Sequence, residues 1–425
     1  MGGGLLQLVA YGAQDVYLTG NPQITFFKVV YRRHTNFSIE SIQQTFNGNA
    51  GFGSRVTCQI SRNGDLVHKL YLQVSGKHTD SDKCLLQPYA GYKLIKHVEL
   101  EIGGQRIDKQ YGEWMYIWNE LTMESGKKTG HQEMVGGNMH NIPVEYSSNN
   151  PLEFYIPLEF WFCRNIGLAL PLIALQYHEV KVNIEFNKFD DLTYSGSNLD
   201  YYETLSIINT AENTTVADST QPTMNFTLWA DYVFLDTDER KRFAQLSHEY
   251  LIEQLQFTGE ESITATTAKS VRLSFNHPCK ELIWVTKPDA TASSIWNNFS
   301  SNVYYDDANE QGTSNYLTKG APNLTKTAKL QLNGNDRFAE RNGDYFSLVQ
   351  PYQHHTNIPV NKGINVYSFA LKPEEHQPSG TLNMSRIDTA QLQLVSEKAG
   401  SVFIYAVNYN VLRILSGMGG LAYSN

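Results

Sequence analysis

The chain has 425 residues, of which 41% are hydrophobic and 18% are charged, and its formal net charge at pH 7 is −9. This length allows two domains that each bury a core, while the acidic balance argues against a broad nucleic-acid-binding surface, which would need clustered Lys and Arg. No stretch reaches the roughly 20 apolar residues of a membrane span, and the start lacks the basic region of a signal peptide. We therefore expect a soluble globular chain made in the cytosol, with no direct binding of nucleic acid.

At the N-terminus, residues 1–24 form a Gly-led apolar segment that is too short to be a domain, so we expect an extended arm. Just after it, Lys28, Arg32 and Arg33 form a local cluster of positive charge. Two interpretations remain open at this point. The cluster is either a surface patch that contacts an anionic partner or a solvated, ion-paired group.

Alternating apolar and polar residues predict strands along most of the chain. The clearest runs are residues 56–60, 66–74, 98–102, 180–186, 226–235, 271–275, 392–394 and 402–415. Between the first two runs, Asn63-Gly64 predicts the turn of a β-hairpin. Many short strands with long, variable connections favour sandwiches or barrels over alternating βαβ units.

Two segments show a helical pattern instead. In residues 111–121, large apolar side chains follow the first one at three, seven and ten positions along the chain. This spacing predicts a helix that lies against the first barrel. Asp236 and Glu239 form a capping-box-like start for a second helix, which we expect to join the two domains. The polar residues 195–223 are interpreted as a surface loop within the first domain.

One series of segments occurs twice in the same order. Residues 37–48 resemble 250–259, 56–60 resemble 271–275, 98–106 resemble 329–337, 154–158 resemble 366–371 and 228–232 resemble 404–409. This order predicts a duplicated fold whose loops have diverged. With a boundary near Thr237, the first domain covers 25–237 and the second covers 238–425. We expect three pairs to superpose: Ile39 on Ile252, Val56 on Val271 and Ala230 on Ala406.

Residues with catalytic or metal-binding chemistry are scarce. Residues 125–130 (SGKKTG) resemble a phosphate loop, but position 121, where that motif needs Gly, is Leu121. The adjacent His354 and His355 lack the spacing of a metal-binding pair, so we expect them in a loop or at a barrel edge. The paired acids at 190–191, 306–307 and 374–375 would diverge in extended backbone and are expected in solvated turns. The sequence therefore predicts no catalytic, cofactor or metal site.

The cysteines and the glycosylation motifs give no further indication of a functional site. Cys58, Cys84, Cys163 and Cys279 are far apart and form no CxxC pair, which predicts reduced, partly buried thiols. Six Asn-x-Ser/Thr motifs occur, and each would be a glycan acceptor only if a glycosylation machinery meets the chain. We expect Asn213 and Asn298, both in predicted loops, to be the more accessible of them.

Five segments have the pattern of a known family: 12–28 (GAQDVYLTGNPQITFFK), 31–33 (YRR), 61–65 (SRNGD), 236–240 (DTDER) and 333–338 (NGNDRF). Through them the chain resembles the major capsid proteins of large eukaryotic double-stranded DNA viruses. The chlorella-virus and phycodnavirus branch is nearest, and iridovirus and marseillevirus capsid proteins are relatives. The resemblance runs from about residue 4 to the C-terminus and is weakest in residues 190–221 and 289–322.

The resemblance implies an all-β fold of two consecutive eight-stranded antiparallel jelly rolls with a few short helices. It implies a structural, non-enzymatic subunit of an icosahedral virion, made in the host cytoplasm. Two barrels in each of three copies give six similar lobes, so a homotrimer would form a nearly hexagonal capsomer that meets neighbouring capsomers. The arm would run along the inner base of the capsomer. Lys28, Arg32 and Arg33 would then face minor capsid proteins or an internal viral membrane.

The jelly-roll architecture alone leaves a second interpretation, a two-domain carbohydrate-binding protein or glycan hydrolase. An enzyme of that kind needs convergent carboxylates or a metal set in a cleft, and the sequence shows neither at recognisable spacing. A stable trimer would favour the shell subunit, and a monomer with glycan affinity would favour the alternative.

Overall fold

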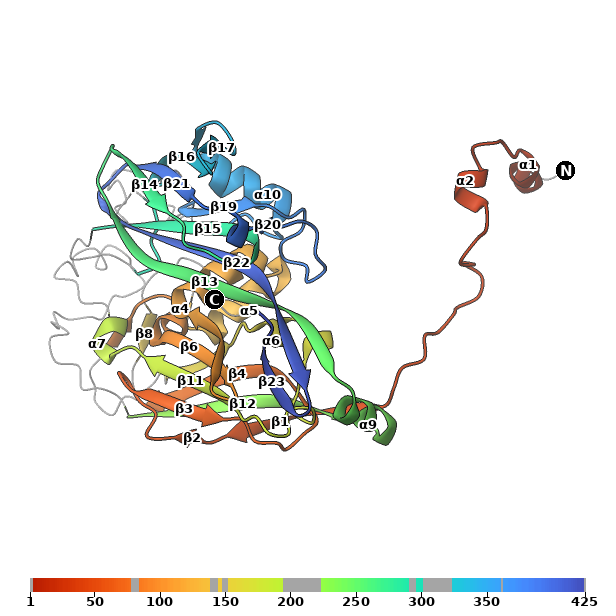
Figure 1. The fold of residues 1–425 in the computed structure, drawn as a ribbon, viewed down its shortest axis with the longest axis horizontal. Helices are drawn as coiled ribbons and strands as arrows, with labels where there is room; N and C mark the ends of the chain where they lie inside the picture. Colours follow the sequence, from red (N-terminus) through yellow and green to blue (C-terminus); the bar gives the residue numbers. More distant parts are fainter. Residues whose placement is uncertain are drawn as a thin grey trace. The chain divides into compact units, whose positions relative to one another are not determined.

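The structure is a computed structural model that describes residues 3–77, 84–137, 144–146, 152–193, 223–289, 296–300, 323–360 and 362–423 (Figure 1). Contacts divide the chain into two units, Met1–Phe37 and Ser38–Asn425, and each is described by itself. The first unit contains two short helices, α1 (Gly3–Val9) and α2 (Val16–Thr19). Its large apolar side chains are exposed, with Tyr17 91% and Phe27 98% accessible, so this unit has no core of its own.

The second unit begins with two antiparallel sheets that form the first jelly roll. Sheet 1 contains, in spatial order, β1 (Phe37–Gln44), β12 (Thr223–Leu235), β4 (Leu66–Lys77) and β10 (Leu170–Pro171), with β9 (Leu152–Pro157) also paired to β4. Sheet 2 contains β2 (Phe46–Asn47), β3 (Arg55–Gln59), β11 (Val180–Phe186), β6 (Ile95–Ile102) and β7 (Gln105–Tyr111). A separate two-stranded pair joins β5 (Cys84–Leu86) to β8 (Val144–Tyr146).

Two further sheets form the second jelly roll. Sheet 3 contains β13 (His248–Ile263), β22 (Gly400–Leu415), β15 (Pro278–Pro288) and β19 (Ile364–Ser368), with β20 (Leu382–Asn383) paired to β15 and β23 (Met418–Leu421) paired to β22. Sheet 4 contains β14 (Ala268–Arg272), β21 (Ala390–Ser396), β16 (Thr325–Leu332) and β17 (Asn335–Asp336), with β18 (Arg341–Asn342) also paired to β16. The all-β double jelly roll predicted from the sequence is confirmed.

The two jelly rolls repeat one strand order. In the first jelly roll β1 pairs with β12, and β12 pairs with β4. In the second, β13 pairs with β22, and β22 pairs with β15 in the same way. Ile39 and Ile252 lie in the equivalent strands β1 and β13, Val56 and Val271 in β3 and β14, and Ala230 and Ala406 in β12 and β22. Each of the four sheets draws its strands from one side of Thr237 only. The boundary at that residue remains a prediction.

Helices lie mainly in the connections, and both predicted helices are confirmed. The first is α4 (Gly112–Thr122), and the second is α9 (Thr237–Gln245), whose start is capped by Asp236 Oδ1 accepting from the Glu239 N–H at 3.0 Å. The other helical segments are α3 (Ala90–Leu94), α5 (Ser125–Met134), α6 (Trp161–Arg164), η1 (Ile166–Leu168), α7 (Phe189–Leu192), η2 (Tyr345–Val349), α10 (Gln350–His354) and η3 (Met384–Arg386). Residues 125–130 thus form the first turns of α5 and not a phosphate loop.

The predicted hairpin at Asn63-Gly64 is wrong. The strands on either side, β3 and β4, belong to different sheets, so the segment between them crosses from one layer of the sandwich to the other. Tyr232 holds this crossing in place, because its hydroxyl donates to the Ser61 carbonyl at 2.5 Å and its ring lies where a Cβ at Gly64 would be. An Asn-Gly turn between two strands with alternating side chains is compatible with a hairpin within one sheet and with a crossing between two sheets. Only the packing of the two layers decides between them.

Candidate functional site

Sheet 3 is buried on both faces, unlike an ordinary sandwich sheet. Along β15, Leu282 and Trp284 join the core of the second jelly roll, whereas Ile283 and Val285 join the core that contains the first. Successive strand residues point to opposite faces, so the outer face of sheet 3 is covered by the first jelly roll. Helix α4 provides part of that cover, with the rings of Trp114 and Tyr405 5.4 Å apart. The candidate functional site is this junction.

Polar contacts fix the junction at several points. The Leu255 N–H donates to Asp108 Oδ1 at 3.1 Å, and Lys287 pairs with Glu113 at the start of α4. At the other end of α4, the Asn357 N–H donates to the Leu121 carbonyl at 2.9 Å. Because each contact joins a residue of one jelly roll to a residue of the other, the contacts fix both the distance between the barrels and their rotation.

A buried acid, Glu253 of β13, lies at the centre of the junction. Its Oε2 is 2.9 Å from Arg164 of the first jelly roll, and its Oε1 is 2.8 Å from Lys280. His376 Nδ1 is 3.4 Å from Oε1. Burial by itself would raise the pKa of Glu253, but Arg164, His376 and Lys280 outweigh burial and lower it to about 2. This carboxylate is therefore ionised at any physiological pH.

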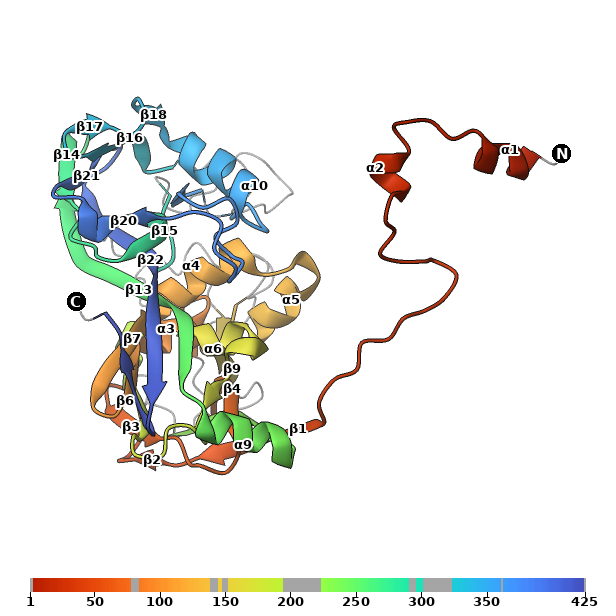
Figure 2. The same ribbon diagram turned by 45° about the vertical axis from the view of Figure 1, so that its right-hand side comes forward.

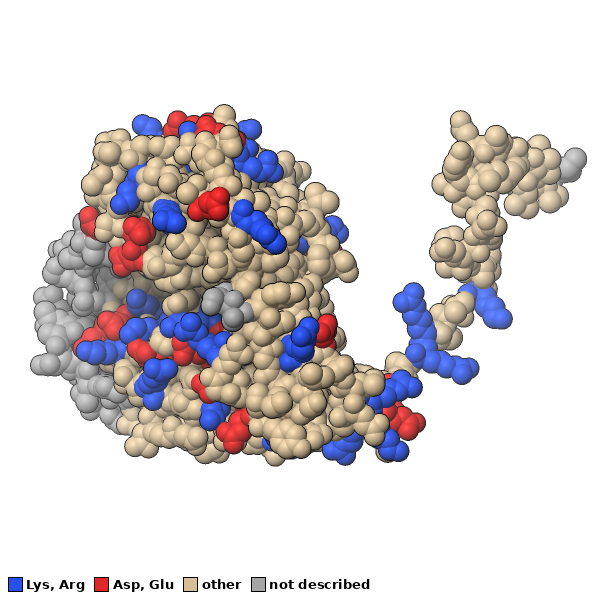
Figure 3. Space-filling view, in the orientation of Figure 1, with Lys and Arg blue, Asp and Glu red and all other residues tan. Residues whose placement is uncertain are grey.

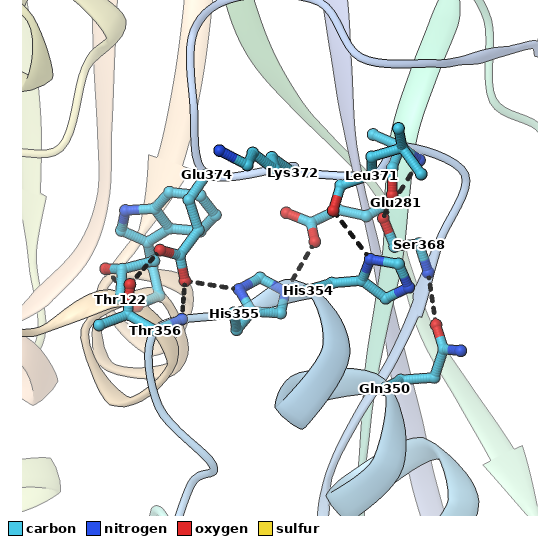
Figure 4. Close-up of polar contacts among 12 residues, drawn as sticks. Thr122, Glu281, Gln350, His354, His355, Thr356, Ser368, Leu371, Lys372 and Glu374 are labelled. Atoms are coloured by element: carbon cyan, nitrogen blue, oxygen red, sulfur yellow. Dashed lines mark hydrogen bonds and ion pairs between the residues drawn. The ribbon is translucent and has the colours of Figure 1, made fainter. Parts of the chain in front are cut away.

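His355 forms a second buried ionic group (Figure 4). Its Nε2 is 2.9 Å from Glu281 Oε2 and its Nδ1 is 2.9 Å from Glu374 Oε1. An ionised carboxylate offers no proton, so the ring must carry a proton on both nitrogens to donate to both acids. Burial alone would lower the pKa of His355, but Glu281 and Glu374 raise it to about 9. The Thr356 N–H and hydroxyl also donate to Glu374, and the next residue, Asn357, reaches α4.

These contacts correct two expectations for the paired residues. His354, the last residue of α10, is half-buried and hydrogen-bonds the Leu371 carbonyl, and the neighbouring His355 side chain is fully buried. Of the pair 374–375, Glu375 meets solvent, whereas Glu374 is held by His355 and has a lowered pKa. A solvated turn was the wrong expectation for Glu374. Its partners lie far away in sequence, so no local pattern could reveal them.

Sheet 1 has an open outer face, in contrast to sheet 3. Tyr71 and Trp229 stack there with ring centroids 6.2 Å apart, and Trp229 Nε1 donates to Gln73 at 2.9 Å. Beside them Tyr155 is 36% exposed, and Ile39 on the edge strand is 48% exposed. Tyr71, Trp229, Tyr155 and Ile39 are called the aromatic face below. Sequence reasoning missed it, although bulky apolar residues at the outward positions of alternating strands were a usable signal.

In the second unit, many charged side chains form ion pairs with one another. Figure 3 shows acidic and basic residues intermixed on the face of this unit that it presents. Glu99, for example, lies within 3.5 Å of Arg55, Arg106 and Lys109. In the N-terminal unit, Lys28, Arg32 and Arg33 are exposed. Within the described part of that unit, Asp15 is the acidic residue, and none of the three cations forms an ion pair there.

Of the two predicted glycan acceptors, Asn213 and Asn298, the structure describes Asn298. Asn213 lies outside the described residues. Asn298 is only 8% exposed, and its Oδ1 accepts from the Ser300 N–H and hydroxyl, so burial disfavours it as an acceptor in the folded chain. Cys58, Cys163 and Cys279 are free and buried, as predicted.

Neither a metal site nor a membrane-spanning helix is found in the described ranges. Within them, no group of three or more His, Cys, Asp or Glu side chains is arranged to hold a metal ion. Across the same ranges, none of the helices has the length and apolar character needed to span a bilayer. What the described residues do offer is a rigid junction between two barrels and exposed apolar surfaces.

Known proteins share this architecture along the whole chain. A family described as "Major capsid protein N-terminus" matches residues 25–236, and "Large eukaryotic DNA virus major capsid protein" matches residues 239–420. The major capsid protein of Pyramimonas orientalis virus is 52% identical, and that of Paramecium bursaria Chlorella virus 1 is 45% identical, each over all of both chains. A quasi-atomic model of the PBCV-1 virus capsid has a TM-score of 0.77 at 40% identity and covers 94% of this chain and 100% of its own.

These matches first define a class, the double jelly-roll capsid proteins. The Faustovirus major capsid protein supports the fold at that level, with a TM-score of 0.73 at 14% identity. The chain itself belongs to the major capsid protein family of large eukaryotic DNA viruses. It is therefore a structural protein of the virion capsid and not an enzyme, which rules out the glycan hydrolase considered from the sequence.

Proposed function

We propose that three copies of this chain close into a pseudo-hexagonal capsomer, and that these capsomers tile the icosahedral shell of a large double-stranded DNA virus. The observation that carries the proposal is the junction between the two jelly rolls. Two barrels with one strand order meet there through different surfaces, sheet 3 of the second and α4 of the first. A head-to-tail contact of this kind forms a closed ring when its rotation divides a full turn. A rotation of one sixth of a turn from each barrel to the next would close six barrels from three chains into a ring.

Sedimentation of the purified full chain tests the proposal. We expect a particle of about three times 48.1 kDa that persists on dilution, since permanent subunit interfaces are large and dissociate slowly. A chain that sediments as a monomer at every concentration would contradict the trimer.

We further propose that Lys28, Arg32 and Arg33 contact an anionic partner on the inner side of the shell, either an acidic minor capsid protein or the anionic lipid of an internal membrane. Support comes from their exposure and from the composition of residues 1–37, which hold these three cations and a single acid, Asp15. Exposed cations attract such surfaces, with about 1 kcal/mol for each Lys or Arg near an anionic bilayer. The competing view is that they pair with acids of neighbouring copies.

Replacing Lys28, Arg32 and Arg33 together by Gln separates these views. We expect normal trimers but defective or salt-sensitive shell assembly, because only the attachment is lost. Flotation of the trimers with anionic vesicles, compared with neutral vesicles, distinguishes lipid from protein as the partner. Trimers that dissociate would assign the cluster to the subunit interface, and normal particles would show that it has no attachment role.

A further inference from the structure

We infer that the aromatic face of one copy is the docking site for the helical segment 343–354 of a second copy. This inference rests on the proposed trimer and names the two surfaces that would form its subunit interface. It follows from the chain's own internal repeat, because the contact between α4 of the first jelly roll and sheet 3 of the second has an equivalent that a single chain leaves unmade.

The first step is the equivalence of two helical segments. Helix α4 begins at Gly112 directly after β7, and the segment 343–354, which contains η2 and α10, begins at Gly343 directly after β18. Both glycines touch a backbone carbonyl where a Cβ would clash, at Tyr92 and at Thr325. Both segments then lead toward equivalent strands, β9 and β19. The segment 343–354 is therefore the second jelly roll's version of α4.

The second step compares what the two segments expose. Trp118 and Leu121 of α4 are 3% and 0% accessible. The residues at the same distances from Gly343 are Val349 and Tyr352, and these are 39% and 77% accessible. Figures 1 and 2 show α10 on the second jelly roll, while α4 lies between the two barrels. A helix surface that is covered in one copy is thus apolar and open in the other.

The third step compares the two sheet faces. Tyr405 pairs with Ile283 in sheet 3, and Trp229 pairs with Tyr71 at the same position in sheet 1, one residue before the equivalent Ala406 and Ala230. Tyr405 and Ile283 are 1% and 0% accessible because the first jelly roll covers them. Trp229 and Tyr71 are both partly exposed.

The two open surfaces also match in chemistry. Trp and Tyr are enriched at the centres of protein interfaces, where they contribute large apolar area and keep one polar group for hydrogen bonding. The aromatic face supplies such side chains, and segment 343–354 supplies Val349 and Tyr352. Because the surfaces differ, the contact is head to tail, so three copies can close and no free surface of either kind is left.

Three variants of the full chain test this assignment by sedimentation. The first carries Ile39→Asp and Tyr155→Asp in the aromatic face, and the second carries Val349→Asp and Tyr352→Asp in segment 343–354. The third is a control with two added acids at other exposed aromatics, Tyr177→Asp and Tyr423→Asp, which are 75% and 62% accessible. We expect the first two to be monomers, with association weakened more than about tenfold, and the control to remain a trimer.

Mixing the first two variants gives a sharper readout. One intact contact remains possible between them, so the mixture should form a heterodimer of about twice 48.1 kDa but no trimer. A mixture that stays monomeric would show that the two surfaces do not meet. Trimeric variants beside a trimeric wild type would overturn this inference and leave the proposed function intact, whereas a monomeric wild type would overturn both. Unchanged thermal unfolding of each variant shows that the barrels themselves are intact.

Discussion

Replacing His355 by Ala is expected to destabilise the folded chain by about 3–5 kcal/mol, because the buried acids Glu281 and Glu374 lose the cation between them. Urea denaturation of the full chain measures the change. The adjacent His354→Ala is a matched control, since His354 is only half-buried and makes one hydrogen bond to a backbone carbonyl, so its loss should cost about 1 kcal/mol. Equal effects of the two substitutions would contradict the buried ionic group.

The same group predicts how stability changes with pH. The pKa of His355 is about 9 in the folded chain, above its ordinary value of 6.5. A raised pKa means that the folded chain holds this proton more tightly than the unfolded chain. The stabilisation is therefore complete below about pH 6.5 and is lost as the pH rises through about 9. The His355→Ala variant should lack this alkaline loss, and its persistence in the variant would assign it to other groups.

Replacing Glu253 by Ala should have an effect of similar size, about 3–5 kcal/mol, because Lys280 and Arg164 would then remain as cations with no carboxylate between them. The control lies in the same strand. Glu249 pairs with Arg413 at 2.8 Å, but both side chains are more than half exposed, so Glu249→Ala should cost about 0–1 kcal/mol. Denaturation of the two variants side by side checks the difference.

A second variant distinguishes a buried charge from a lost contact. Replacing Glu253 and Lys280 together by Leu removes the acid and its fully buried cation and leaves only the partly exposed Arg164 unpaired, so it should be less destabilising than Glu253→Ala alone. The pH dependence has the opposite sign to that of His355. The pKa of Glu253 is lowered to about 2, so its stabilisation is present above about pH 4.5 and is lost as the pH falls through about 2. The Glu253→Ala variant should lack this loss of stability between about pH 4.5 and pH 2, and its persistence in the variant would contradict the assignment.

Both ionic groups lie at the junction of the barrels and not in either barrel's own core. This position has a physical consequence, since apolar surfaces alone attract without fixing an orientation. The contacts of Glu253 with Arg164, and of the His355 loop with α4, have defined geometry. A shell subunit needs such a fixed angle, because an error in the rotation between two barrels would be repeated around the ring.

The sequence by itself determined the local structure and the duplication. Alternation of apolar and polar residues gave the strands, the spacing in 111–121 gave α4, and Asp236 with Glu239 gave the start of α9. These signals depend on neighbours within one element, and their order in the two halves is a property of the chain alone.

Only the tertiary structure decided how the elements meet. It placed β3 and β4 in different sheets, where the Asn-Gly signal had predicted a hairpin. It also brought His355 between Glu281 and Glu374, and it buried Tyr405 while leaving Trp229 partly exposed. The physical reason is that burial and charge pairing arise between residues far apart in sequence, whereas periodicity reports only which face of an element is apolar. Two equivalent strands with the same alternation can therefore differ in what covers them, and that difference defines the surfaces through which this capsid protein would assemble.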